Sequence, residues 1–266
     1  MPESALLLSA GYGTRLRPLT NSWPKCLMPI HGIPLMEYWL ANLRQAGVSR
    51  VHVNTHHHDL VVTDFLQREV FKDFISIHHE PSLLGTAGTI RKVFHDRPQE
   101  PVVVIHADNW TFVNLLDVVN FHIKVRQPST AMTMVTFRCN DPRKFGIVRC
   151  NKLGIVDNFF EKQEVFHGNI ANSAVYIFDP SVISWVSKNQ NVTDISIEVL
   201  PKFVGRIQAF FYDGIHRDIG TPPELLKAQN DPQQALPWPQ ADSWSKWFNN
   251  HEIHALISQM EKEAVY

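Results

Sequence analysis

Two glycines, a threonine and two cations follow the first apolar run of this sequence. The stretch SAGYGTRLRPLT places Gly11, Gly13, Thr14 and Arg15 in close succession, and Lys25 follows in a Pro-Lys pair. Glycines let backbone N–H groups approach an anion closely, and an arginine can hold a phosphate through two parallel hydrogen bonds. The pattern matches neither the dinucleotide fingerprint nor a Walker loop. A glycine-rich turn alone is usually an ordinary connection, but the cations and prolines that follow this one favour a phosphate-binding loop.

A second glycine-rich stretch, HEPSLLGTAGTI, leads into a predicted helix. Gly85 and Gly88 bracket the start of that helix. Free backbone N–H groups at such a position can contact a phosphate or a nucleotide base. The same residues would also suit a plain helix N-terminus, so this stretch by itself leaves both interpretations open.

Two aspartates that lie far apart in the sequence could hold a hard cation. Asp108 ends the apolar run VVVIHAD, and Asp218 stands just before a glycine and a predicted helix start in HRDIGTPPEL. Magnesium is commonly bound by one or two carboxylates together with substrate phosphates. Each aspartate could equally close a turn or cap a helix, so the metal hypothesis requires the fold to bring both to one place.

The elements that must position these residues alternate between strand and helix from residue 5 to residue 108. Apolar runs predict buried strands, and a period of about 3.6 residues predicts helices. The predicted strands are Ala5–Ser9, Val51–Thr55, Phe74–His79 and Pro101–Asp108, and the predicted helices are Pro34–Val48, His58–Val70 and Thr86–Asp96. This alternation favours a parallel sheet covered on both faces, with the ligand-binding loops at one edge.

After residue 130 the pattern changes to short strand-like runs separated by Gly, Asn and Pro, which indicates antiparallel hairpins. Helices are predicted near residues 181–189 and 195–204. Residues 230–243 are rich in Pro and Gln and are interpreted as a linker. One final amphipathic helix is predicted within residues 244–264. Its members that would cover an apolar patch are Trp244, Trp247, Phe248, Ile253 and Leu256.

Composition disfavours several classes of protein. The 266 residues are 44% hydrophobic and carry a net charge of -1, which argues against a disordered chain and against a nucleic-acid-binding surface. Three cysteines without a CxxC pair disfavour a disulfide framework and a structural zinc site. The apolar runs are too short to span a membrane, so we expect a cytoplasmic protein without a membrane partner. The THHH stretch at 55–58 is interpreted as a solvated loop, because neighbouring side chains on an extended chain point to opposite faces.

Taken together, SAGYGTRLRPLTNSWPKCLMPIHGIPLMEY, EPSLLGTAG and DIGTP resemble the sugar-1-phosphate nucleotidylyltransferases, or nucleotide-sugar pyrophosphorylases. The resemblance extends from about residue 5 to about residue 228, and the LGTAG form is similar to that of mannose-1-phosphate and heptose-1-phosphate guanylyltransferases. It implies an α/β, Rossmann-like three-layer sandwich with a mixed, mostly parallel central sheet, the nucleotide-diphospho-sugar transferase fold. It also implies a catalytic domain at 1–229, with a nucleotide-binding half at about 1–125 and a sugar-binding half at about 126–229. A linker and a helical tail would follow at 230–266.

The resemblance also implies roles for individual residues. Arg15, Lys25 and Asp108 would be catalytic, and Asp108 and Asp218 would bind Mg2+. The nucleotide would contact Ala10, Gly11, Gly13, Thr14, Arg15, Lys25, Glu80, Gly85 and Thr86, and the sugar would contact Asn109, Gly146, Glu161, Lys162 and Asn172. Two departures from the family pattern bear on the sugar pocket. Gln163 replaces a proline, and Ser173-Ala174 replace Ala-Gly.

The implied reaction transfers a nucleoside monophosphate from an NTP to a sugar 1-phosphate and releases pyrophosphate. The preferred substrates are GTP and mannose- or heptose-1-phosphate. UTP or dTTP with a glucose-type or muramic-type sugar 1-phosphate is the alternative within this class. A catalytically silent, nucleotide-sugar-binding regulatory subunit is the alternative from another class, although the intact Arg15, Lys25, Asp108 and Asp218 favour an enzyme. The oligomeric state, including a homo-oligomer, stays open.

Overall fold

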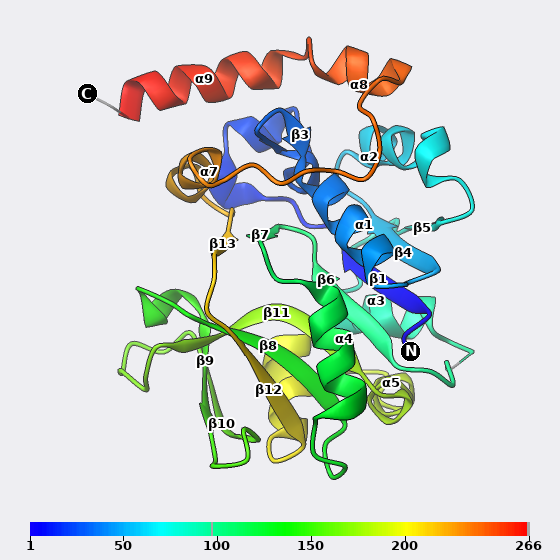
Figure 1. Ribbon diagram of the computed structural model, residues 1–266, viewed down its shortest axis with the longest axis vertical. Helices are drawn as coiled ribbons and strands as arrows, with labels where there is room; N and C mark the ends of the chain where they lie inside the picture. Colours follow the sequence, from blue (N-terminus) through cyan, green and yellow to red (C-terminus); the bar gives the residue numbers. More distant parts are fainter. Residues whose placement is uncertain (97, 265–266) are drawn as a thin grey trace.

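The computed structural model describes residues 1–96 and 98–264 and has three layers (Figure 1). A large mixed sheet forms the middle layer, and helices pack against both of its faces. This arrangement is the expected α/β fold. In the described ranges, no helix combines the length and the apolar character that crossing a membrane requires.

The strands and helices have well-defined bounds along the chain. The strands are β1 (Ser4–Leu8), β2 (Pro29–Ile30), β3 (Ile33–Pro34), β4 (Arg50–Thr55), β5 (Ile75–His79), β6 (Val102–His106), β7 (Asn109–Thr111), β8 (Met132–Arg138), β9 (Gly146–Cys150), β10 (Val156–Glu161), β11 (Ile170–Phe178), β12 (Ile207–Tyr212) and β13 (His216–Asp218). The helices are α1 (Leu35–Gln45), α2 (Asp59–Leu66), α3 (Thr86–Val93), α4 (Leu115–Lys124), α5 (Pro180–Lys188), α6 (Leu200–Phe203), α7 (Pro222–Gln229), α8 (Ser243–Phe248) and α9 (Glu252–Ala264).

The N-terminal half of the sheet is parallel, as the sequence predicts. β1 pairs in parallel with β4 on one side and with β6 on the other, and β5 continues the parallel order beyond β4. Ala5 and Leu7 of β1 enter the core that contains α1, whereas Leu6 enters the core that contains α3. Because both faces of the strand are covered, its apolar residues run consecutively rather than alternating with polar ones.

β11 joins this parallel half to the rest of the sheet. It pairs antiparallel with β6, and its other neighbours, β8 and β9, are also antiparallel to it. β12 lies parallel to β8, and β10 lies antiparallel to β9. The sheet is therefore mixed, and it runs through both halves that the sequence predicts.

Helix α4 has no counterpart among the predicted elements. Asn114 caps it by accepting a hydrogen bond from the backbone N–H of Leu116 at 2.9 Å, and the helix buries Leu115, Val118 and His122. An asparagine directly before an apolar run is the signal that indicates such a start.

Helix α2 is shorter than predicted. It ends at Leu66 rather than Val70, and a 3-10 turn then carries Phe71 into the core.

The C-terminal segment differs from its prediction in two ways. The expected linker packs against the body of the molecule, because Trp238 is buried and Asp231 accepts hydrogen bonds from Arg217 and from the indole of Trp110. The expected single helix is divided into α8 and α9. An Asn-Asn pair, which favours a helix poorly, follows α8, and the ring of His251 accepts a hydrogen bond from the N–H of Ile253 at the start of α9.

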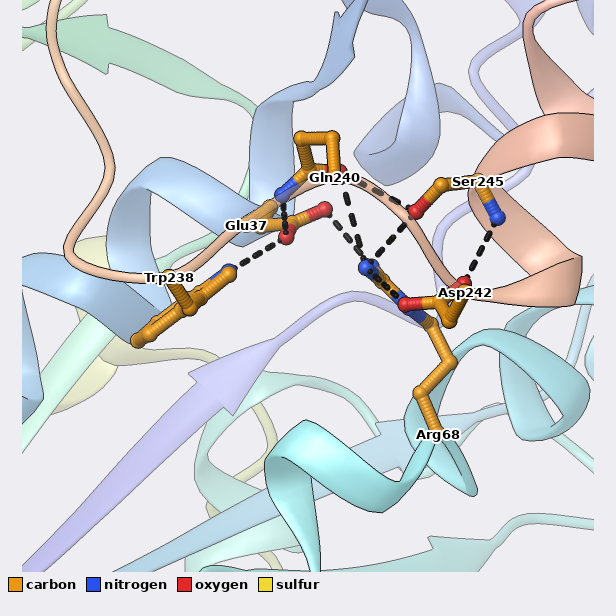
Figure 2. Close-up of polar contacts among 6 residues, drawn as sticks. All are labelled: Glu37, Arg68, Trp238, Gln240, Asp242 and Ser245. Atoms are coloured by element: carbon orange, nitrogen blue, oxygen red, sulfur yellow. Dashed lines mark hydrogen bonds and ion pairs between the residues drawn. The ribbon is translucent and has the colours of Figure 1, made fainter.

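A buried polar network fastens this segment to the body of the molecule (Figure 2). The guanidinium of Arg68 donates to Glu37 Oε2 at 2.7 Å and to Asp242 Oδ2 at 2.9 Å from Nε and 2.7 Å from Nη2. It also donates to Ser245 Oγ at 2.9 Å. The Arg68 network consists of Glu37, Arg68, Trp238, Gln240, Asp242 and Ser245.

Charge and hydrogen bonding are both satisfied in the Arg68 network. The second oxygen of Glu37 accepts from Trp238 Nε1 and from Gln240 Nε2, each at 2.5 Å. Glu37 lies in the first turn of α1, and Asp242 caps α8 by accepting from the N–H of Ser245. Helix N-termini favour negative charge, so the two helices help to balance two carboxylates against one guanidinium.

Replacing Arg68 should lower the free energy of unfolding more than replacing an exposed cation. Arg68→Met leaves the fully buried carboxylate of Glu37 without a counter-charge, so the free energy of unfolding should fall by about 3–5 kcal/mol. Urea unfolding followed by tryptophan fluorescence measures this loss. Lys72→Met removes an exposed ion pair with Glu69 and serves as the control, with an expected change below about 1 kcal/mol. Equal losses in the two variants would contradict the role of the network.

Candidate active site

Four charged side chains meet at the edge of the sheet where β6 ends. Lys25 Nζ lies 2.5 Å from Asp108 Oδ2 and 3.2 Å from Asp218 Oδ1. Arg15 Nη2 lies 3.3 Å from the other oxygen of Asp218. The Lys25 side chain is 10% exposed, whereas that of Arg15 is 64% exposed. The cluster thus has a buried lysine at its centre and an exposed arginine at its rim.

The small β7–β13 ribbon brings the two aspartates together. Its antiparallel register places Asn109 opposite Asp218, and the N–H of Ile219 donates to the carbonyl of Asp108 at 3.2 Å. Gly220 follows, and its N–H donates to Asp218 Oδ1 at 2.9 Å. A Cβ atom on Gly220 would lie 2.8 Å from that carboxylate and 2.9 Å from the Arg15 guanidinium, so a larger residue there would displace the Arg15–Asp218 pair.

The loop after β1 is folded tightly around the start of the Lys25 turn. Gly13 has a φ of +63°, and a Cβ atom on it would lie 2.9 Å from Thr20 and 3.1 Å from Lys25. The hydroxyl of Thr20 donates to the carbonyl of Gly13 at 2.9 Å. Gly11 has open space around it, and Thr14 is exposed. Gly13 is therefore required by packing, while Gly11 and Thr14 are free to face a ligand.

Opposite charges control the ionisation of the cluster. Burial by itself would raise the pKa of Asp108, but the Lys25 ammonium outweighs burial and lowers that pKa to about 2. Burial would lower the pKa of Lys25, yet the two carboxylates hold it above its ordinary value. The ionised Asp108 therefore stabilises the fold above the ordinary aspartate pKa of 3.8, and this contribution is lost as the pH falls through about 2.

The two aspartates form a suitable donor set for a hard divalent cation. Carboxylate oxygens from Asp108 and Asp218 already converge on one positive charge, that of Lys25. Elsewhere in residues 1–96 and 98–264, no group of three or more His, Cys, Asp or Glu side chains is arranged to hold a metal ion. Two protein carboxylates completed by substrate oxygens is the arrangement typical of Mg2+.

One cavity of about 220 Å3 opens beside the end of β1. It is lined by Leu8, Ala10, Gly11, Asn54, Glu80, Leu83, Gly85, Thr86, Thr89, His106 and Asp108. The residues predicted to contact a nucleotide fall into two groups. Ala10, Gly11, Glu80, Gly85 and Thr86 line this cavity, whereas Gly13, Thr14, Arg15 and Lys25 do not.

The wall of this cavity at the second glycine-rich stretch is held rigid by internal bonds. Glu80 accepts hydrogen bonds from Asn54 at 3.0 Å, from the Thr89 hydroxyl at 2.6 Å and from the N–H of Leu84 at 3.1 Å. The Thr86 hydroxyl accepts from the N–H of Ile195. These side chains therefore shape the wall of the cavity.

A second cavity of about 160 Å3 shares His106 and Asp108 with the first. All five residues predicted to contact the sugar line it: Asn109, Gly146, Glu161, Lys162 and Asn172. Arg15, Asp108 and Asp218 also line it. Burial raises the pKa of Glu161 although Lys162 lies beside it.

An irregularity in β11 turns polar groups into the second cavity. The pairing of β11 with β8 shifts register between Asn172 and Tyr176, and Ala174 has a φ of +57°. The amide of Asn172 is held at both ends, because it donates to the Tyr176 hydroxyl at 2.7 Å and accepts from the N–H of Ala174 at 3.0 Å. Bulges of this kind commonly re-aim side chains beside functional sites.

Several lining residues were not predicted from the sequence. The second cavity also contains Lys144, Phe145, Ser173, Ala174, Ser196 and His216. Lys144 and His216 stand close to predicted residues in the chain, so local spacing could have indicated them. Ser196 belongs to a turn of π-helix at Ile195–Val199, and only the tertiary fold brings it here.

His106 lines both cavities and was also missed. Its Nε2 atom is buried and has no hydrogen-bond partner. Burial lowers the pKa of this imidazole despite the nearby carboxylates, so it is neutral at neutral pH. An unpaired polar atom between two cavities is a natural contact for a ligand that spans them.

The histidines at 56–58 brace the first loop rather than forming a solvated loop. His57 and His58 each place Nε2 within 3.2 Å of the carbonyl of Thr20. His56 contacts the Tyr12 hydroxyl at 3.0 Å and the carbonyl of Glu80 at 2.8 Å. The three histidines are partly buried and hydrogen-bonded, so the prediction of a solvated loop is wrong. Nothing contradicts the prediction that they do not form a metal site.

Comparison with known proteins identifies the class. Residues 4–235 match the family model described as nucleotidyl transferase, and this match covers most of the chain. The chain therefore belongs to the nucleotidyl transferase family, as the sequence motifs indicated.

Individual relatives and solved structures are similar to much of the chain. The chain is 32% identical over 234 residues to mannose-1-phosphate guanyltransferase beta-A of Xenopus laevis, across 84% of this chain and 62% of that protein. It thus spans less than two thirds of the length of that relative. A UDP-glucose pyrophosphorylase complexed with UDP-glucose has a TM-score of 0.72 at 21% identity, over 86% of this chain and 98% of that one. HddC from Yersinia pseudotuberculosis complexed with GMP-PN has a TM-score of 0.70 at 22% identity, over 86% and 98%. These two likenesses confirm the nucleotide-diphospho-sugar transferase fold.

The charge balance of the cluster can be measured directly. In Lys25→Met, burial acts on Asp108 without the ammonium, so the pKa of Asp108 should rise from about 2 to above its ordinary value of 3.8. The carboxyl 13C shift of Asp108, followed by NMR over a pH series, reports this change. Lys227→Met removes an exposed lysine paired with Glu224 and should leave the titration unchanged. An unaltered Asp108 titration in Lys25→Met would rule out the proposed balance.

Proposed function

We propose that the protein transfers a nucleoside monophosphate from an NTP to a sugar 1-phosphate and releases pyrophosphate. The observation that supports this most strongly is that two cavities share Asp108 and His106. One cavity is walled by glycine-rich loops that suit a nucleotide, and the other is lined by a carboxylate, amides and lysines that suit a phosphorylated sugar. The bond that forms would then lie at the junction, beside the Asp108–Lys25–Asp218 cluster.

The reaction needs alignment and charge neutralisation more than proton transfer. A phosphate oxygen of the sugar 1-phosphate attacks the α-phosphorus of the NTP, and the bond from that phosphorus to the oxygen bridging to the β-phosphate breaks. Because the attacking oxygen is already an anion, no strong general base is required. Lys25 would face the α-phosphate region from the cluster, and the exposed Arg15 would offset charge on the departing pyrophosphate.

We assign the divalent cation to Asp108 and Asp218 and propose Mg2+. When bound, it supplies a Lewis acid that neutralises charge on the reacting phosphates. The β7–β13 ribbon would hold Asp108 and Asp218 in place for it, and Lys25 lowers the pKa of Asp108 before substrates arrive. Asn109, buried at the same ribbon, is held by a hydrogen bond to the carbonyl of His106 and stiffens the shared wall.

The preferred substrates are GTP and mannose- or heptose-1-phosphate. The LGTAG loop and the 32% identity to a protein named mannose-1-phosphate guanyltransferase support this choice. UTP or dTTP with a glucose-type or muramic-type sugar 1-phosphate is the alternative. Gln163 and Ser173-Ala174 depart from the family pattern, and Ser173 and Ala174 line the second cavity, so the sugar could differ from that of the relatives.

Removing either charge partner should slow turnover steeply in a folded protein. Asp108→Asn and Arg15→Ala should each lower kcat by about 10^2–10^3, because each deletes a charge contact made to the reacting phosphates. Pyrophosphate release at saturating substrate measures the effect. The control is Glu69→Gln, which removes an exposed carboxylate paired with Lys72 and should leave kcat within about twofold. Near-normal turnover in both site variants would refute the mechanism.

A substrate panel separates the candidate functions. Each of GTP, UTP, dTTP, ATP and CTP is offered with mannose-, glucose-, heptose- and N-acetylmuramate-1-phosphate, and pyrophosphate is measured. We expect GTP with mannose- or heptose-1-phosphate to give the highest kcat/KM. A higher value with UTP or dTTP would replace this choice by the alternative. Nucleotide-sugar binding without pyrophosphate release from any pair would support the regulatory subunit instead.

A further inference from the structure

The segment after residue 235 lies outside the family match and nevertheless packs against the loop between β1 and α1, which carries Lys25. The match ends at residue 235, and α8 and α9 follow it. In Figure 1 these two helices, orange and red, extend along one end of the molecule beyond α2 and α7. Their buried residues, among them Trp244, Phe248 and Ile253, belong to the same core as the loop between β1 and α1.

The contact between this segment and the loop is centred on Trp23. The Trp23 side chain is fully buried, and its ring stacks on Phe248 of α8 with centroids 5.4 Å apart and planes 20° apart. The ring of His251 lies 4.3 Å away, and that of Trp247 lies 5.8 Å away. Large aromatic contacts of this kind fix the position of both partners.

Trp23 in turn spans the turn that carries Lys25. Its indole Nε1 donates to the carbonyl of Leu27 at 2.8 Å, and the 3-10 turn between them is Lys25–Leu27. Gly13 closes the other side of this turn, since a Cβ atom there would meet Lys25. The Lys25 backbone is thus held between the glycine loop and the Trp23 ring.

The segment is anchored firmly enough to act as a support. The Arg68 network fixes the residues before α8 and caps that helix through Asp242 (Figure 2). Trp244 of α8 packs against Phe65 with ring centroids 4.9 Å apart and stacks on Phe248 at 5.0 Å. A continuous line of buried contacts therefore runs from Arg68 through Trp244 and Phe248 to Trp23.

We propose that residues 236–264 form a brace that positions Lys25 for the reaction, with Phe248 and Trp23 as the positioning residues. The proposal rests on the role of Lys25 given above and extends it to a segment outside the shared domain. Phe248 touches no cavity of the site, so it acts only through Trp23 and the Lys25 turn. Removing the Phe248 ring should let this turn shift, and Lys25 would then meet the reacting phosphates at the wrong distance.

The first test compares two buried positions in the tail. Phe248→Ala should lower kcat about tenfold with little change in KM, because Lys25 is proposed to act on the transition state. Ile257→Ala removes a buried side chain from α9, which packs against α7, and should leave kcat within twofold. Phe248→Leu, which fills the space and preserves folding if the alanine variant is too unstable, should fall between wild type and Phe248→Ala. Equal kcat losses in Phe248→Ala and Ile257→Ala would overturn the brace.

A double-mutant cycle then asks whether Phe248 acts through Lys25. If it does, adding Phe248→Ala to Lys25→Met should cause no further loss of kcat, whereas independent effects would multiply. Trp23→Phe, which keeps a ring but loses the hydrogen bond to Leu27, should show the same dependence on Lys25. Multiplying effects would overturn the proposal. A Lys25→Met variant with the kcat of the wild type would refute the role of Lys25 itself. A lowered kcat in Lys25→Met together with an unchanged kcat in Phe248→Ala would refute the brace alone.

Discussion

A buried ammonium group shared by two carboxylates is the interaction on which this structure depends. Lys25 reaches that point from the loop after β1, Asp108 from the end of β6, and Asp218 from β13. A buried ion pair is tolerable only when every charge is matched, because an uncompensated charge in the interior is costly. The fold therefore has to hold three distant segments in fixed register, and the β7–β13 ribbon, the tight turn at Gly13 and the Trp23 ring each hold one part of it.

The same charges explain how a site for phosphates can exist before phosphates arrive. One ammonium and one guanidinium pair with the two carboxylates, and the ammonium lowers the pKa of Asp108. Substrates that bring several negative charges, together with a divalent cation, would replace these internal pairs by stronger ones. The two cavities share Asp108 and the neutral His106 as lining residues.

Much of the fold and of the candidate site could be predicted from the sequence. The remaining features could not, for physical reasons that can be named. Apolar runs predicted β1 and β6 because these strands are buried on both faces. The family motifs predicted Asp108 and Asp218, although only the ribbon register shows how they meet. Ser196 carries no local signal, because a tertiary contact alone places it in a cavity wall, whereas His106 stands close to the predicted Asp108 in the chain. The packing of residues 230–243 and the division of the final helix could not be predicted, because contacts with Arg68 and Glu37, which lie far away in the sequence, hold this segment.

The central claim is that Asp108 and Asp218 serve a single cation beside Lys25. A crystal structure with Mn2+ and a non-hydrolysable NTP analogue, with anomalous scattering recorded at the manganese edge, tests it most directly. The account predicts one anomalous peak in contact with a carboxylate oxygen of each aspartate, with the Lys25 ammonium turned toward the phosphates. A peak that contacts neither aspartate, or an undisturbed Lys25–Asp108 pair beside bound nucleotide, would contradict it.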